Sequence, residues 1–149
     1  MTLIAFACND NTKATVNTTD TLAKQDTTPL ADTAISGCYS MTANRDTASL
    51  QLQRKGTIIT GSLSYNLFEK DHNDGTFQGE MGNGLLTGWY LFRSEGVISV
   101  RQVAWKIGNG YLWPGNGEVM MRHDTTMFVN VDKLSFDQSR AFVKVKCTI

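Results

Sequence analysis

The stretch from Thr57 to Phe92 decides the fold, and from Ile59 onward it reads ITGSLSYNLFEKDHNDGTFQGEMGNGLLTGWYLF. Three phrases recur in it, each with a glycine inside an apolar strand pattern: ITGSL at 59–63, FQGEM at 77–81 and LTGWY at 86–90. Since a glycine inside a strand is typical of a bulge or a tight bend, we interpret the stretch as an antiparallel meander whose strands bend sharply at these glycines.

Period-two alternation marks the most clearly defined strand, over residues 57–68. Every second residue from Ile59 to Leu67 is apolar or glycine, and threonine, serine and asparagine occupy the positions between them. Residues 47–54 alternate in the same way. Both segments therefore predict strands with one buried and one exposed face.

Other strands are predicted where short apolar runs lie between turn signals. They cover residues 36–42, 76–81, 85–93, 97–107, 111–113, 118–122, 126–131 and 141–149. Residues 97–107 also fit a helical stripe that begins after Ser94, but their β-branched residues favour a strand. Trp89 and Tyr90 point to opposite faces of their strand, which indicates a strand that is buried on both sides or central in the sheet. Residues 134–140 fit either a short helical turn or a loop.

Two of the predicted turns bear on function. The charged segment 69–75 ends in Asp74–Gly75, a dipeptide typical of hairpin turns, and residues 114–117 read PGNG, which predicts a turn or a bulge. The segment 69–75 does not fit a calcium loop, because Thr76 stands where the sharp turn of such a loop needs glycine. We therefore predict no metal site.

The strand candidates, about nine at short spacing, predict an all-β fold. Sequential strands, frequent glycines and alternating faces favour an antiparallel meander of about eight to nine strands that closes into a small barrel. A β-sandwich is the alternative.

The first residues, MTLIAFAC at 1–8, resemble the end of a bacterial lipoprotein signal peptide, in which the cysteine is lipidated. The apolar part is short and no basic residue precedes it, so an ordinary hydrophobic N-terminus with a free Cys8 is the alternative. Residues 9–35 are rich in threonine, asparagine and aspartate and have no periodicity, which predicts a disordered tether. The β-barrel domain is expected over residues 36–149.

The chain has three cysteines, Cys8, Cys38 and Cys147. If Cys8 carries lipid, the other two form an even pair, one in the first predicted strand and one in the last. These strands are neighbours in a closed barrel, so we expect a disulfide between Cys38 and Cys147, formed in an oxidising compartment. Two buried thiols that never meet are the alternative. The chain has no Cys-x-x-Cys pair, so a zinc or redox-dithiol site is not indicated.

The overall charge argues against one class of partner. Lysine plus arginine and aspartate plus glutamate number 14 each, which gives a formal net charge of zero. A neutral chain lacks the basic surface expected of a protein that binds nucleic acid. No apolar run approaches the roughly 20 residues that span a bilayer, so contact with a membrane is expected only through the lipid anchor.

From Ser36 to Cys147 the layout resembles a family of small envelope lipoproteins of Bacteroidota-type bacteria. The phrases that carry the resemblance are GCY at 37–39, GSLSYN at 61–66, FEKD at 68–71, SEGV at 94–97 and FVKVKC at 142–147. This resemblance implies a location in the cell envelope, on the periplasmic or surface side and at the outer membrane. More distantly, the glycine-punctuated meander with scattered tryptophans is similar to the calycin barrels, including lipocalins and avidins. That likeness implies that a barrel of this size can hold a ligand.

Candidate ligand-binding residues gather downstream of the meander. If residues 85–93 and 97–107 pair about Glu95–Gly96, Arg93 lies near Ser99, and Glu95 lies within reach of Arg101. Charged side chains beside aromatic ones at a barrel mouth would bind a small hydrophobic, anionic or planar ligand. The candidate residues are Trp89, Tyr90, Arg93, Glu95, Arg101, Trp105 and Trp113. The alternative is an ion pair that supports the hairpin, with the tryptophans filling the core.

No catalytic residue or cofactor is predicted, since His72 and His123 lie in polar segments with no nucleophile pattern beside them. We expect a non-catalytic, lipid-anchored module of the cell envelope. It would bind a small molecule in the barrel or an envelope protein on its surface. The first alternative is an inhibitor or assembly factor that recognises an envelope protein through the exposed loops 69–75 or 114–117. A hydrolase is the second.

Overall fold

The computed structural model describes residues 34–70 and 72–148, and the strands of this part form one sheet. Its strands are β1 (Gly37–Ala43), β2 (Asp46–Lys55), β3 (Ile58–Asn66), β4 (His72–Gly82), β5 (Leu85–Ser94), β6 (Val97–Ile107), β7 (Tyr111–Asn116), β8 (Val119–Arg122), β9 (Thr125–Phe128), β10 (Ser135–Phe136) and β11 (Phe142–Val145). Two short 3₁₀ helices, η1 (Val131–Lys133) and η2 (Gln138–Arg140), lie between the last strands.

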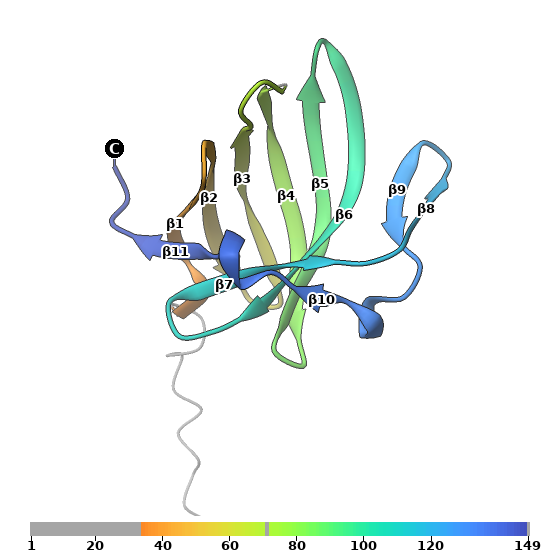
Figure 1. Cartoon of the computed structure of the whole chain (residues 1–149). Helices are drawn as coiled ribbons and strands as arrows, with labels where there is room; N and C mark the ends of the chain where they lie inside the picture. The colour runs from red at the N-terminus through yellow and green to blue at the C-terminus, as the bar shows by residue number, and fades with distance from the viewer. Residues whose placement is uncertain (1–33, 71, 149) are drawn as a thin grey trace, which may run out of the picture.

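The sheet closes into an antiparallel barrel of eight strands. Strands β1 to β6 pair in chain order, β7 pairs with both β6 and β11, and β11 pairs with β1. The extra strands lie outside this ring: β9 pairs in parallel with β6, β8 pairs with β9, and β10 pairs with β7 (Figure 1). The predicted all-β meander and its closure are confirmed, whereas the sandwich alternative is wrong.

Alternating faces build the core as the sequence predicted. In β2, Leu50 and Leu52 are buried while Gln51 between them is exposed, and in β3, Ile59 and Leu63 are buried on the same side. The larger buried side chains are Trp105, Tyr90, Phe77, Phe142 and Met41, none more than 1% exposed. The ambiguous segment 97–107 is the strand β6 and not a helix, because both of its edges find partners in the barrel wall.

The recurrent glycines mark points where neighbouring strands approach too closely for a side chain. Gly79 of β4 lies opposite Gly88 of β5. A Cβ atom on Gly79 would lie 2.1 Å from the backbone oxygen of Thr87, and one on Gly61 would lie 2.0 Å from a backbone oxygen of β2. These glycines therefore permit a close approach of the backbones, a role that explains why the phrases ITGSL, FQGEM and LTGWY share one pattern.

The predicted turn at Asp74–Gly75 is wrong. Strand β4 already begins at His72, and Asp74 and Gly75 pair with residues of β3. The chain turns earlier, around Glu69, which has a positive φ of 54°. Gly75 has the same role as the other strand glycines, because a Cβ atom there would lie 1.9 Å from the backbone oxygen of Leu91.

The predicted turn or bulge at 114–117 is wrong for residues 114–116, which belong to β7. Pro114 lacks a backbone N–H, and it lies where β7 passes from its pairing with β11 to its pairing with β10. Its carbonyl still accepts a hydrogen bond from the backbone N–H of Asp137 at 3.0 Å. A proline fits this strand because its missing backbone N–H falls in the gap between the part of β7 that pairs with β11 and the part that pairs with β10.

The expectation that residues 85–93 are buried on both sides is also wrong. In β5 the residues Leu86 and Tyr90 are buried, but Trp89 and Leu91 are 42% and 47% exposed on the outer face of the barrel. The last strand is shorter than predicted and ends at Val145. Residues 134–140, left between two interpretations by the sequence, contain β10 and η2.

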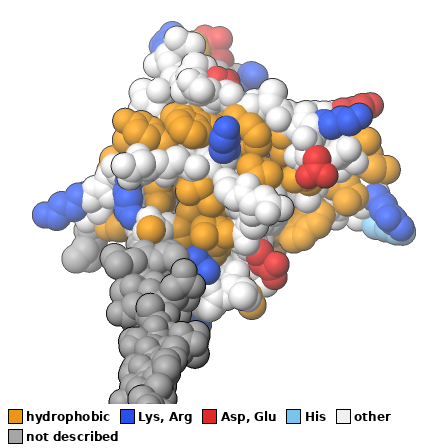
Figure 2. All heavy atoms as spheres, turned by 90° about the horizontal axis from the view of Figure 1, so that it is seen from below, with side chains coloured by type: hydrophobic (Ala, Val, Ile, Leu, Met, Phe, Trp, Pro, Cys, Tyr) orange, Lys and Arg blue, Asp and Glu red, His pale blue; other side chains and the backbone are white. Residues whose placement is uncertain are grey.

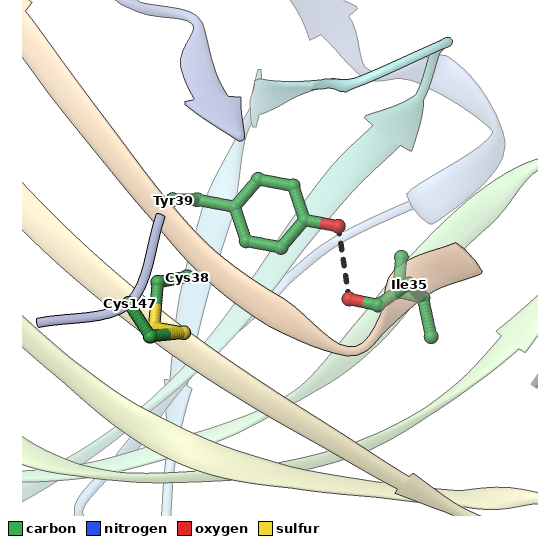
Figure 3. Close-up of a disulfide and its surroundings, with 4 residues drawn as sticks. All are labelled: Ile35, Cys38, Tyr39 and Cys147. Atoms are coloured by element: carbon green, nitrogen blue, oxygen red, sulfur yellow. Dashed lines mark hydrogen bonds between the residues drawn. A yellow bond between two sulfur atoms is a disulfide. The ribbon is translucent and has the colours of Figure 1, made fainter. Parts of the chain in front are cut away.

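The disulfide between Cys38 and Cys147 is present, and the Cα atoms of the two cysteines lie 5.2 Å apart. Cys38 is opposite Val145 in the pairing of β1 with β11, so the bond joins the chain's first strand to the segment just after its last one (Figure 3). Nearby, the Tyr39 hydroxyl donates a hydrogen bond to the backbone oxygen of Ile35, which is itself buried. Cys8 and the predicted tether, apart from residues 34 and 35, lie outside the described residues.

Candidate ligand-binding site

Aromatic side chains fill one half of the barrel. The Trp105 ring meets the edges of Phe77 and Phe142, with ring centroids 5.4 Å and 6.0 Å apart. The Tyr90 ring stacks on Phe92 at 4.8 Å, and its hydroxyl donates a hydrogen bond to the backbone oxygen of Leu63. The barrel is therefore not hollow along its length, and Trp105 and Phe142 form the floor of the space that remains.

A cavity of about 390 Å³ lies above this floor, and its volume is within the usual range for small-molecule sites. Its wall combines residues of the barrel strands, β7 among them, with residues of β8, β9 and η2. Strand β9 lies beside the middle of β6, where it pairs with Val100 and Arg101. The polar and aromatic lining residues that matter for binding are Tyr65, Asn73, Arg101, Trp105, Arg140 and Phe142.

Arg140 already has an anionic partner. Its guanidinium donates a hydrogen bond to a carboxylate oxygen of Asp46 at 3.0 Å, and the other oxygen of Asp46 accepts from the backbone N–H of Phe68 at 2.8 Å. The Phe68 hydrogen bond and the Arg140 guanidinium lower the pKa of the Asp46 carboxyl, so this group is charged at neutral pH. The pair positions Arg140 at the cavity while balancing its charge.

Arg101 is in a different situation. It lies opposite Tyr90 in the pairing of β5 with β6, so it belongs to the inner face of the strand, but the residue is exposed to solvent. Its guanidinium is 5.6 Å from the centre of the Phe92 ring. Within residues 34–70 and 72–148, no carboxylate forms an ion pair with it. Arg101 is thus a positive charge at an aromatic cavity, balanced by none of the carboxylates in that part of the chain.

Tyr65 provides a neutral donor beside this charge. Burial raises the pKa of the Tyr65 hydroxyl to about 12, and the guanidinium groups of Arg101 and Arg140 offset only part of this effect. The hydroxyl therefore keeps its proton at neutral pH. The ring packs edge-on against Tyr90 and Phe142, with centroids 6.2 Å apart in both cases.

Two polar atoms of the lining residues are buried without a hydrogen-bond partner among the described residues. They are the side-chain oxygen of Asn73 and the indole N–H of Trp105. A buried polar group left unpaired costs about 1–3 kcal/mol. A ligand that reaches these atoms would recover part of that free energy, so the cavity favours a molecule with both acceptor and donor groups.

The residues predicted from the sequence divide between the two faces of the barrel wall. Tyr90, Arg101 and Trp105 lie on the inside, where the last two line the cavity and Tyr90 supports Tyr65. The others do not join them: Trp89 and Arg93 lie on the outer face of β5, Glu95 is in the β5–β6 turn, and Trp113 stacks on Tyr111 of β7. Arg93 pairs with Ile98, one position from the expected Ser99.

Sequence reasoning missed Tyr65, Asn73 and Arg140 as lining residues. Tyr65 carried a signal, since it continues the apolar face of its strand to the end where the barrel opens. Asn73 was assigned to a turn, and Arg140 lies in a segment without periodicity. The placement of Arg140 depends on its contact with Asp46, a residue 94 positions away in the chain.

The fold and the cavity together define the class of this protein as an eight-stranded antiparallel β-barrel with a ligand-sized space at one end. No family model matches the chain, and the comparisons with curated proteins and with solved structures also give no match. Within the described residues, no three histidine, cysteine, aspartate or glutamate side chains are grouped so as to hold a metal ion. None of the helices described there has the length and apolar character to cross a membrane.

Proposed function

We propose that this chain is a non-catalytic binding module whose cavity takes a small amphipathic molecule with an anionic group. One observation carries the proposal: Arg101, which pairs with no carboxylate of the described residues, shares an aromatic cavity with the protonated hydroxyl of Tyr65. A guanidinium and a neutral phenol both donate hydrogen bonds, and such donors prefer a charged acceptor.

The ligand would lie with its anionic group toward Arg101 and Tyr65. Its apolar or planar body would contact Phe142 and the floor formed by Trp105, whose indole N–H would donate to a second acceptor of the ligand. Arg140 would contribute less, because Asp46 already offsets its charge. A carboxylate or sulfonate on an aromatic or aliphatic body has this combination of groups.

The test uses 1-anilinonaphthalene-8-sulfonate, a planar sulfonate whose fluorescence rises in apolar surroundings. We expect saturable binding at one site, weakened about tenfold or more by Arg101→Ala, because a charge-assisted hydrogen bond contributes about 1.5–3 kcal/mol. Lys106→Ala is the matched control, since it removes a positive charge from the same strand at a position outside the cavity lining. Equal affinities for the wild type and Arg101→Ala would refute the proposal.

We also propose that the domain is anchored in the cell envelope through a lipid on Cys8. The apolar stretch that ends at Cys8 supports this location, and the disulfide between Cys38 and Cys147 fits an oxidising compartment. Mass spectrometry of the protein from the membrane fraction tests the anchor: a diacylglyceryl adduct on Cys8 is expected, and an unmodified thiol would contradict it.

A second candidate function, binding an envelope protein as an inhibitor or assembly factor, is favoured by strand β8. This strand lies at the edge of the sheet, and its residues Val119, Met120 and Met121 are 54%, 47% and 73% exposed. An exposed apolar edge strand is suited to pairing with another chain. Crosslinking in intact cells tests this function. Met121→Lys should abolish the crosslinked complex, whereas Arg101→Ala should leave it intact. A complex that forms equally well with Met121→Lys would exclude this surface.

Other exposed apolar side chains are distributed over the surface. Seen from below, apolar side chains are visible in several groups, with charged side chains scattered between and around them (Figure 2). The sequence suggested the segments 69–75 and 114–117 as loops that contact a protein partner. Residues 114–116 are not a loop, because they belong to β7 and line the cavity. The edge strand β8 is the better surface for a protein partner.

A further inference from the structure

The outer wall of the barrel has a second hollow, which shares one lining residue, Gln102, with the cavity. It has a volume of about 640 Å³ and lies over β3, β4, β5 and the middle of β6. Trp89 is part of its lining and is 42% exposed, although the neighbouring Tyr90 points inward and is buried. A large aromatic ring that is held on a strand and left open to solvent is a natural stacking surface.

Polar side chains flank this ring in register. Gln78 of β4 pairs with Trp89, and Trp89 pairs with Gln102 of β6, so the three side chains form a row across adjacent strands. The Gln102 side-chain oxygen accepts a hydrogen bond from the backbone N–H of Phe128 at 3.0 Å. This contact fixes the amide and leaves its N–H groups to donate, while Gln78 can both donate and accept.

The charge of the hollow excludes several ligand classes. Its lining contains one carboxylate, Glu80, and neither lysine nor arginine, while Thr76 and Thr87 contribute hydroxyl groups. Phosphates, nucleic acids and anionic lipid headgroups need positive side chains, so none of these fits. The hollow therefore does not suit an anion, and its exposed ring and amides suit a ligand with a flat apolar face and hydrogen-bonding groups at its edge.

We infer that this hollow is a binding site for a neutral carbohydrate. A pyranose ring has a face of C–H groups that would stack on Trp89, and hydroxyl groups around its edge that both donate and accept hydrogen bonds. The amides of Gln78 and Gln102, together with Glu80, match such hydroxyls. The stacking residue Trp89 lies on the opposite face of the wall from Arg101, although Gln102 also lines the cavity. The inference does not depend on the function proposed for the cavity.

Neutral oligosaccharides of glucose, mannose, xylose, galactose and N-acetylglucosamine are the probes, measured by titration calorimetry with the folded, oxidised domain. We expect at least one of them to bind with a dissociation constant of about 1 mM or tighter. Trp89→Ala is expected to weaken that binding about tenfold, whereas Trp89→Phe, which keeps a stacking ring, loses less. Tyr111→Ala is the matched control, because Tyr111 is a similarly exposed aromatic residue on β7, outside the hollow.

Arg101→Ala separates the two sites, since it should leave oligosaccharide binding unchanged. Circular dichroism of each variant shows whether its fold is retained. The inference is overturned if none of the oligosaccharides binds the wild type at about 10 mM. It is equally overturned if Trp89→Ala, correctly folded, binds as the wild type does, or if a nucleoside binds in place of every sugar.

Discussion

Gly79→Ala tests directly whether the glycines of the meander serve close strand approach. The added Cβ atom would lie 2.1 Å from the backbone oxygen of Thr87 and 2.8 Å from the Cα atom of Gly88, and both neighbours are backbone. Such contacts do not occur below 3.0 Å, so β4 and β5 would have to separate by about 0.9 Å at this pair. No side-chain rotation can relieve the contact.

The cost follows from that separation. Forcing a methyl group into a packed site costs about 1–3 kcal/mol, and weakening the adjacent ladder hydrogen bonds adds about 1 kcal/mol for each bond lost. Replacing glycine by alanine in the chain returns up to about 1 kcal/mol through the unfolded state. We therefore expect Gly79→Ala to lower the free energy of unfolding by about 2–4 kcal/mol.

Guanidinium-induced unfolding, followed by far-ultraviolet circular dichroism with the disulfide intact, measures this difference. Gly82→Ala is the matched control, because Gly82 ends the same strand and a Cβ atom there would meet nothing within 4 Å. The control should change stability by less than about 0.5 kcal/mol. If Gly79→Ala is as stable as Gly82→Ala, the account of the recurrent glycines is wrong.

Two further predictions concern the closure of the barrel and its buried phenols. Replacing both Cys38 and Cys147 by serine removes a crosslink between residues 109 positions apart. The chain-entropy model predicts that this lowers the free energy of unfolding by about 4–5 kcal/mol. Equal denaturation midpoints for the wild type and the double variant would contradict this prediction. The raised pKa of Tyr65, about 12 against 10.0 for an unperturbed tyrosine, means that the unfolded chain loses this proton first. The contribution of Tyr65 to stability should therefore be full below pH 10 and should fall as the pH rises through about 12, by up to about 1.4 kcal/mol per pH unit. Burial also raises the pKa of Tyr90 and of Tyr39, so the comparison with Tyr65→Phe isolates this contribution. Denaturation at a series of pH values checks this, and an equally steep fall in Tyr65→Phe would show that Tyr65 is not responsible.

The sequence predicted the barrel because its main signals are local. Alternation along residues 47–54 and 57–68 depends only on which face of a strand is buried, and it survives unchanged in β2 and β3. The disulfide was predictable for a related reason, since a closed barrel makes the first and last strands neighbours. Both inferences required only the two-residue period of a strand and the closure of the sheet into a barrel. Neither required knowledge of how the side chains pack.

The predictions that were wrong concern residue types, glycine and proline above all, that occur both in turns and within strands. Asp74–Gly75 and Pro114–Gly115 look like turns, but in the structure these glycines and the proline lie within strands, where neighbouring strands approach closely or a pairing partner changes. Trp89 was grouped with Arg101 because both are candidates for binding. The pleat of β5 and β6 places Trp89 on the outside of the barrel and Arg101 on the inner face. The two residues therefore belong to different surfaces.

The cavity was only partly predictable, because its lining comes from distant segments. Arg101 and Trp105 belong to one strand and were identified together, but Arg140 reaches the cavity through its contact with Asp46 in β2. Segments outside the barrel complete the wall, where β9 pairs with β6 in parallel. A parallel pairing of this kind leaves no signature in the spacing of apolar residues.

The indole N–H of Trp105 gives the most direct test of the cavity as a ligand site. This N–H is buried and has no partner among the described residues, so its nuclear magnetic resonance signal reports on a ligand that reaches the floor. We predict that titration with 1-anilinonaphthalene-8-sulfonate shifts the Trp105 indole signal, assigned by Trp105→Phe, and leaves that of Trp113 in place. Shifts confined to Trp89 or Trp113, with the Trp105 signal unchanged at saturation, would contradict the account.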